Sequence, residues 1–183
     1  PRGYQLLEEE NINYSPAKHT TASRSRLFHR EQQPIEVDLE STPVHLVDRR
    51  QFDQILTEWA VERGTNLHEN TAIRDVVQEG NTVKINTVSG QSLSSRFLVG
   101  ADGFRSRVRA VLDFPEQVEG AALTVKLPKD FYSCPDELVF NLDSRINGYS
   151  WIFPGRGQLN AGIAGYSIDS SLRKLLLGFI EKI

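Results

Sequence analysis

The chain has 183 residues and a formal net charge of −3, with 39% hydrophobic and 25% charged residues. This composition is typical of a folded globular protein and excludes a disordered tail. The apolar stretches are short and broken by charges, which excludes a bilayer-spanning segment. No basic cluster alternates with aromatic residues, so a nucleic-acid partner is not expected. The single cysteine, Cys134, excludes a disulfide framework and fits a reducing, cytoplasmic compartment.

Neither end of the sequence has the features of a natural terminus. The chain contains no methionine and begins with Pro1, and its last residues continue a predicted helix without a cap or a glycine. No signal peptide accounts for the missing start. We therefore expect the chain to be part of a longer protein and to be inactive by itself.

The first third of the sequence predicts one well-defined helix that follows short strands. Asp48 and Gln51 have the spacing of a helix N-cap, and an apolar face recurs from Phe52 to Ala60. Gly64 ends the pattern. The segments expected before this helix are a helical turn at 3–10, a loop at 11–25, and strands at 27–31 and 35–40.

A hairpin and a buried strand are predicted next. Gly80-Asn81 is a two-residue turn between strands 72–79 and 82–88, and strand 92–95 follows. The run 97–99 is wholly apolar, which indicates a strand buried on both faces, as in a parallel sheet. The remaining expected elements are a helix at 105–112, strands at 120–127, 137–142, 149–154 and 158–166 in a largely antiparallel sheet, and a final helix capped by Asp169.

An Asp-Gly turn between a strand and a helix is the strongest local signal for a binding site. The run 100–109 reads GADGFRSRVR, so an apolar strand delivers Asp102 and Gly103 to a helix start. Open α/β sheets bind ligands at the carboxyl ends of strands, and Gly103 allows a ligand to approach the backbone. The Asp102 carboxylate can accept hydrogen bonds from a ribose or ribityl hydroxyl. The alternative is an ordinary surface turn before a basic helix.

Two segments resemble the p-hydroxybenzoate-hydroxylase-like flavoproteins. The pattern Gly-Ala-Asp-Gly-x-x-Ser-x-Val-Arg at 100–109 is similar to their second FAD-contacting motif. This resemblance implies that Asp102 and Gly103 hold FAD, with Asp102 at its riboflavin part. The run 47–56, VDRRQFDQIL, resembles the helix that precedes this motif, which implies that Arg49 also lies near the cofactor. A surface ion pair is the alternative role for Arg49.

A further motif resembles the aromatic substrate-site signature of geranylgeranyl reductases. It reads Tyr-x-Trp-x-Phe-Pro at 149–154, and seven residues separate it from Gly162. Alternation along a strand places its aromatic side chains on one face, as a wall that suits a long apolar isoprenoid chain. The resemblance implies that Gly162 leaves room for the lipid or the flavin. It also implies a lipid pocket lined by Tyr149, Trp151, Phe153 and Pro154. An ordinary core strand is the alternative.

Several features of these flavoproteins are absent from the sequence. It has no Gly-x-Gly-x-x-Gly after an opening strand, no later Gly-Asp motif, and Ala164 where the reductases usually repeat a glycine. Their cysteine-glycine segment is also missing, and Cys134 is in the wrong place to replace it. The expected fold class is α/β (α+β), with part of a Rossmann-like FAD-binding domain and a largely antiparallel substrate-domain sheet. The expected division is a connecting, substrate-side segment (1–48), a partial FAD-binding domain with an inserted hairpin (49–115), and a substrate-binding sheet with a terminal helix (116–183).

In the intact protein, the resemblance implies an FAD-dependent reductase of the geranylgeranyl-reductase type. Reduced flavin would pass a hydride to an isoprenoid carbon–carbon double bond. The implied partners are an isoprenoid lipid, an electron donor of the NAD(P)H or ferredoxin-like class and, through the lipid, a membrane surface. Two alternatives remain: an aromatic monooxygenase, hydroxylase or halogenase of the same fold, and a non-catalytic module that binds a lipid or a protein partner.

Other candidate sites are weaker. The four histidines are scattered through the sequence without ligand spacing, so no metal site is predicted. No catalytic acid or base can be assigned from the sequence.

Overall fold

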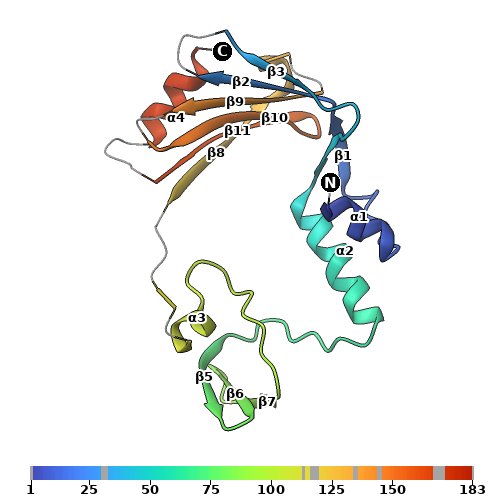
Figure 1. The fold of residues 1–183 in the computed structure, drawn as a ribbon, viewed down its shortest axis with the longest axis vertical. Helices are drawn as coiled ribbons and strands as arrows, with labels where there is room; N and C mark the ends of the chain where they lie inside the picture. The colour runs from blue at the N-terminus through green and yellow to red at the C-terminus, as the bar shows by residue number, and fades with distance from the viewer. Residues whose placement is uncertain are drawn as a thin grey trace. The chain divides into compact units, whose positions relative to one another are not determined.

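The computed structural model describes residues 2–29, 33–112, 114–115, 120–133, 136–143, 146–166 and 172–182. The chain divides into two compact units (Figure 1): unit 1 comprises residues 1–64 and 119–183, and unit 2 comprises residues 65–118. Unit 1 thus contains the 49–62 helix, whereas the sequence-based division begins its middle segment at residue 49. That functional division into three segments stays a prediction.

The main element of unit 1 is a six-stranded sheet with the order β3-β2-β9-β10-β11-β8. Strand β2 pairs in parallel with β9, and every other pairing in this sheet is antiparallel. The largely antiparallel sheet expected for the C-terminal segment is confirmed. The strands are β2 (Arg24–His29), β3 (Ile35–Asp38), β8 (Ala121–Pro128), β9 (Glu137–Asp143), β10 (Gly148–Pro154) and β11 (Gln158–Gly165).

Helix α4 (Leu172–Ile180) covers one face of this sheet. Its Leu176 is buried with Ile163 of β11 and with Ile146. A second buried cluster lies beside it, where Val139, Ile152, Leu159 and Ala161 pack against Phe179 and Ile180 of the helix. The expected cap of this helix, Asp169, lies outside the described residues, as does Cys134.

The described residues of unit 1 also form two further α-helices, a short 3-10 helix η1 (Lys129–Phe131) and a second, two-stranded sheet. Strands β1 (Lys18–Ala22) and β4 (Val44–Val47) pair antiparallel, and α1 (Arg2–Glu9) precedes them. The sequence prediction of a loop over 11–25 is therefore wrong for β1. The polar, threonine-containing β1 has no alternating apolar pattern, so its pairing with β4 could not be read locally. Helix α2 (Arg49–Glu62) begins as expected, because the Asp48 carboxylate accepts the Gln51 backbone N–H at 3.1 Å.

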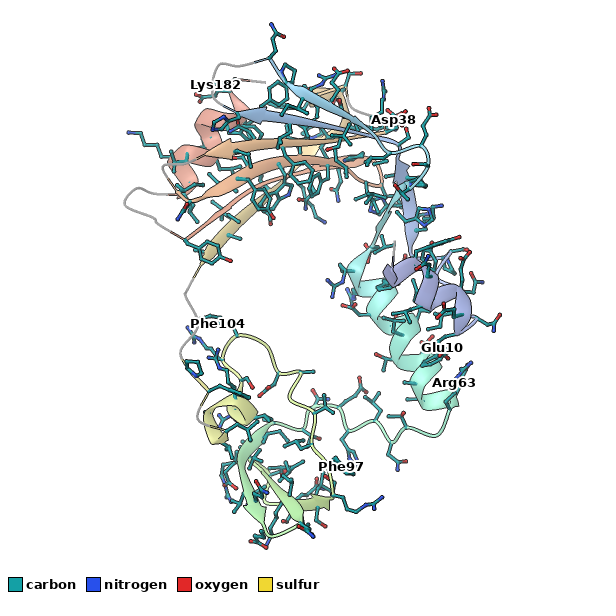
Figure 2. The ribbon with its side chains drawn as sticks, in the orientation of Figure 1. Glu10, Asp38, Arg63, Phe97, Phe104 and Lys182 are labelled. Atoms are coloured by element: carbon teal, nitrogen blue, oxygen red, sulfur yellow. The ribbon has the colours of Figure 1, made fainter. Side chains whose placement is uncertain are left out.

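Unit 2 contains a three-stranded meander, β5 (Ile73–Glu79), β6 (Thr82–Thr87) and β7 (Ser92–Ser95), followed by α3 (Arg107–Val111). The expected hairpin at Gly80-Asn81 is confirmed. The expected buried strand at 97–99 is not: this segment pairs with no described strand. Phe97, labelled in Figure 2, is 81% exposed, and Val99 is 85% exposed. A strand buried on both faces needs neighbours on both sides, and the described residues of unit 2 supply none.

Candidate functional site

An aromatic surface lies on the face of the six-stranded sheet opposite α4. Tyr149, Trp151 and Phe153 alternate along β10 with buried Ser150 and Ile152. The ring centroids of Tyr149 and Trp151 are 5.6 Å apart, and those of Trp151 and Phe153 are 6.1 Å apart. The expectation that these three side chains share one strand face is therefore confirmed.

Phe140 of β9 adds a fourth ring that the sequence analysis missed. Its centroid lies 5.9 Å from that of Tyr149 and 5.1 Å from that of Phe153, so one ring contacts both ends of the β10 series. Phe140 and Trp151 are partners in the β9–β10 register. The sequence did predict a strand at 137–142. It did not predict the register of that strand against β10, and this register is what places Phe140 beside Trp151. We call Phe140, Tyr149, Trp151 and Phe153 the aromatic floor.

The register extends this face across the whole sheet. Directly paired residues point to the same side of a sheet, so each strand contributes one member to a row through Trp151. Ile35 at one end of this row is 60% exposed, and Tyr149 in the neighbouring row is 41% exposed. The row consists of Ile35, Leu27, Phe140, Trp151, Gly162 and Thr124.

Gly162 does not leave open space above the sheet. A Cβ at this position would lie 2.2 Å from Cζ2 and 2.5 Å from Cε2 of Trp151, so the indole already fills the site. The indole Nε1 donates a hydrogen bond of 2.8 Å to Oδ1 of Asn160, the diagonal neighbour on β11. The expectation that Gly162 makes room for a ligand is corrected: its missing side chain makes room for Trp151. Asn160 was not singled out from the sequence, because nothing local pairs it with Trp151.

Pro154 lies apart from the aromatic floor. It is buried, and the alternation of β10 places it on the side of Ile152 rather than of Phe153. With His19, Lys129 and Arg156 it borders a cavity of about 290 Å³ at the end of the sheet. The structure therefore brings together three of the four residues expected to line a lipid pocket.

The Asp102 turn lies in unit 2. The Asp102 carboxylate accepts the backbone N–H of Arg107 at 2.7 Å, and its hydrogen bond with Ser106 is the main cause that holds its pKa below the usual value. Ser106 in turn caps α3 by accepting the Arg109 N–H at 3.0 Å. Asp102 is thus an ionised acceptor at a helix start.

The backbone at Gly103 is open to solvent on the side where a side chain would stand. Its φ of +78° is a conformation that side chains rarely adopt, and a Cβ built there would meet no heavy atom within 4 Å. The backbone is therefore open beside the Asp102 carboxylate. These features fit a ligand that bears hydroxyl groups and approaches the chain closely.

Arg49 lies on the first turn of α2 in unit 1. Its side chain is 79% exposed and forms an ion pair of 3.2 Å with Asp53, one turn further along the helix. The alternative considered from the sequence, a surface ion pair, is therefore present. Arg49 and Asp102 belong to different units, and the guanidinium of Arg49 is accessible to an anion from solvent.

No helix in the described ranges is both long enough and apolar enough to cross a bilayer.

Comparison with known protein families gives one match that covers most of the chain. Residues 5–131 match a family described as FAD binding domain. An uncharacterized protein of Methanosarcina barkeri is 25% identical over 179 residues, which cover 95% of this chain and 44% of that protein. The digeranylgeranylglycerophospholipid reductase 1 of Methanococcoides burtonii is 30% identical over 142 residues, which cover 70% of this chain and 34% of the reductase. The chain spans less than half the length of these relatives.

Solved structures share the fold. The halogenase PltM, in complex with phloroglucinol and FAD, superposes with a TM-score of 0.71 at 11% identity, over 98% of this chain and 42% of PltM. PqsL of Pseudomonas aeruginosa, a probable FAD-dependent monooxygenase, gives a TM-score of 0.68 at 16% identity, over 90% of this chain and 48% of PqsL. The predicted α/β (α+β) fold class is confirmed. The family match and the reductase relative also confirm the resemblance to FAD-dependent flavoproteins that was stated from the sequence, and the family match confirms FAD as the cofactor.

Proposed function

The chain belongs to the FAD-binding domain family, and from this premise we propose that the protein reduces carbon–carbon double bonds of an isoprenoid lipid. The relative named digeranylgeranylglycerophospholipid reductase 1 supports this substrate class. Because such a lipid resides in a membrane, the proposal includes contact with a membrane surface.

The aromatic floor is the observation that carries the proposal. Its four rings form a continuous apolar surface on the sheet face opposite α4. The indole N–H of Trp151 is already paired with Asn160, so this donor does not require a partner from a ligand. A polyunsaturated chain offers apolar area and no hydrogen bonds, and such a surface binds it by contact and by excluding water.

The proposal also assigns contacts with FAD to Asp102, Gly103 and Arg49. The open backbone at Gly103 and the ionised Asp102 carboxylate would hold the hydroxyl-bearing part of FAD. Arg49, whose exposed guanidinium is accessible to an anion, is assigned a cofactor contact on the resemblance of its helix alone. Reduced FAD, when bound, supplies a hydride.

The test uses the full-length protein, purified and reduced in the absence of oxygen. Addition of a geranylgeranyl lipid is expected to restore the absorbance of oxidised flavin and to yield a lipid with fewer double bonds, measured by mass spectrometry. Flavin that stays reduced with the lipid, yet reacts with oxygen to hydroxylate or halogenate an aromatic ring, would favour the monooxygenase or halogenase alternative. A protein that takes up no FAD would favour a binding module.

A variant pair tests the FAD assignment. Asp102→Ala is expected to lower the fraction of protein that retains FAD after gel filtration. Asp75→Ala is the matched control, because Asp75 is also a hydrogen-bonded carboxylate of unit 2 but lies on β5. Equal FAD retention in the two variants would remove Asp102 from the assignment.

A further inference from the structure

Two groups on β11 hold the middle ring of the aromatic floor in one orientation. Asn160 accepts the Trp151 indole N–H at 2.8 Å, and the six-membered part of the indole lies over the backbone of Gly162. A ring that covers a glycine lies low on the sheet, because no side chain lifts it. Trp151 stands between Tyr149 and Phe153 on β10, while Phe140 contacts both of them from β9, so the orientation of the indole decides whether the surface is level along β10 itself.

We propose that Asn160 is a positioning residue that sets the chain-length preference of the aromatic floor by holding the Trp151 indole down over Gly162. The inference rests on the proposed function, since it assumes that an isoprenoid chain lies along the floor. It assigns Asn160 a role in selectivity through Trp151, without contact with the reacting atoms.

The preference follows from the dimensions of β10. From Tyr149 to Phe153 the strand advances four residues, or about 13 Å at 3.3 Å per residue. A long chain that lies along β10 and contacts both end rings passes over Trp151, whereas a short chain can occupy one end alone. Without the Asn160 acceptor, the indole N–H gains by turning toward water, and a raised ring would block the path along β10 between Tyr149 and Phe153. Loss of Asn160 should therefore weaken the binding of long chains and leave short chains unaffected.

The experiment compares geraniol, with ten carbons, and geranylgeraniol, with twenty, on full-length protein loaded with FAD. In the wild type the longer alcohol is expected to bind more tightly. Asn160→Leu removes the acceptor at similar size, and we expect about a tenfold loss of affinity for geranylgeraniol with no change for geraniol. Asn160→Asp keeps an acceptor oxygen, and Lys126 is its register partner on β8, so this variant is expected to retain the preference.

A double-variant cycle separates positioning from a general effect on folding. Once Trp151→Phe has removed the indole N–H, adding Asn160→Leu should change neither affinity. Gly162→Ala should reproduce the selective loss by lifting the ring, with Gly178→Ala as the control, because a Cβ at Gly178 meets no atom within 4 Å.

Three results would overturn the inference. An equal loss of affinity for both alcohols in Asn160→Leu, with a lower unfolding midpoint, would assign Asn160 a structural role only. Unchanged selectivity in a wild-type-like Asn160→Leu would reject the inference and leave the proposed function standing. A wild-type protein that binds neither alcohol would reject both.

Discussion

The position of each ring on the aromatic floor depends on residues of the adjacent strands. Phe140 contacts both ends of the β10 series, while the orientation of the Trp151 indole is set by Asn160 and Gly162 of β11.

Trp151→Ala should weaken the binding of an isoprenoid chain by about 1–3 kcal/mol, the contribution of one large apolar side chain. Calorimetric titration would measure this loss, with Trp59→Ala on α2 as the control. Unchanged affinity in Trp151→Ala, with a lowered free energy of unfolding, would show that Trp151 stabilises the sheet and does not bind the lipid.

Two half-buried histidines make the stability of unit 1 dependent on pH. Burial is the main cause that lowers the pKa of both His19 and His45. Arg156 adds to the shift at His19, against the opposing effect of Asp48, and Lys18 adds to it at His45. Because the folded chain resists protonation at both sites, the unfolded chain binds more protons as the pH falls through about 6.5.

The free energy of unfolding should therefore decrease between pH 7.5 and pH 5.5. Urea denaturation at the two pH values measures the change. The variant carrying His19→Gln and His45→Gln should lose less stability than the wild type over the same interval. An equal or larger loss in that variant would assign the pH dependence to other groups.

Two glycines of unit 1 differ in whether the structure around them can accept a side chain. A Cβ at Gly148, the first residue of β10, would lie 1.9 Å from the carbonyl oxygen of Ala164, whereas a Cβ at Gly178 in α4 would meet nothing. Gly148→Ala should lower the free energy of unfolding by roughly 1–3 kcal/mol, because backbone must move. Gly178→Ala should raise it by about 0.5–1 kcal/mol, because alanine favours a helix interior. Denaturant titration followed by tryptophan fluorescence would compare them, and effects of the same sign would contradict this account.

Elements specified by local chemistry could be predicted from the sequence, and those specified by distant pairing could not. The N-cap and apolar face of α2 lie within one helix, and the Gly80-Asn81 turn lies within one hairpin. In contrast, β1 is a strand only through β4, and the apolar run at 97–99 is unpaired despite its composition. The same holds within the site: alternation predicted the shared face of Tyr149 and Trp151, whereas the Asn160 hydrogen bond depends on the β10–β11 register.

The two units differ in how many apolar side chains they bury. In the described part of unit 2, Val76 and Thr87 are the buried side chains. Unit 1 has two apolar clusters on the face of its six-stranded sheet that α4 covers. Backbone amides open more readily where few apolar groups are buried. Native-state hydrogen exchange should therefore show lower protection for β5 and β6 than for β10 and β11. Equal protection in the two sheets would mean that both units open in one cooperative step.

The parallel pairing of β2 with β9 has a consequence for the order of events during synthesis. Ser23 and Asp136, hydrogen-bonded at the start of these strands, are 113 positions apart in sequence. At about 5–20 residues per second, a ribosome takes roughly 6–23 s to make the intervening stretch. Residues 65–118 are complete before β9 exists, so the unit inserted in the middle of the chain can fold before the unit that begins it. Throughout that interval β2 has an open edge, and the nascent chain must avoid mispairing there.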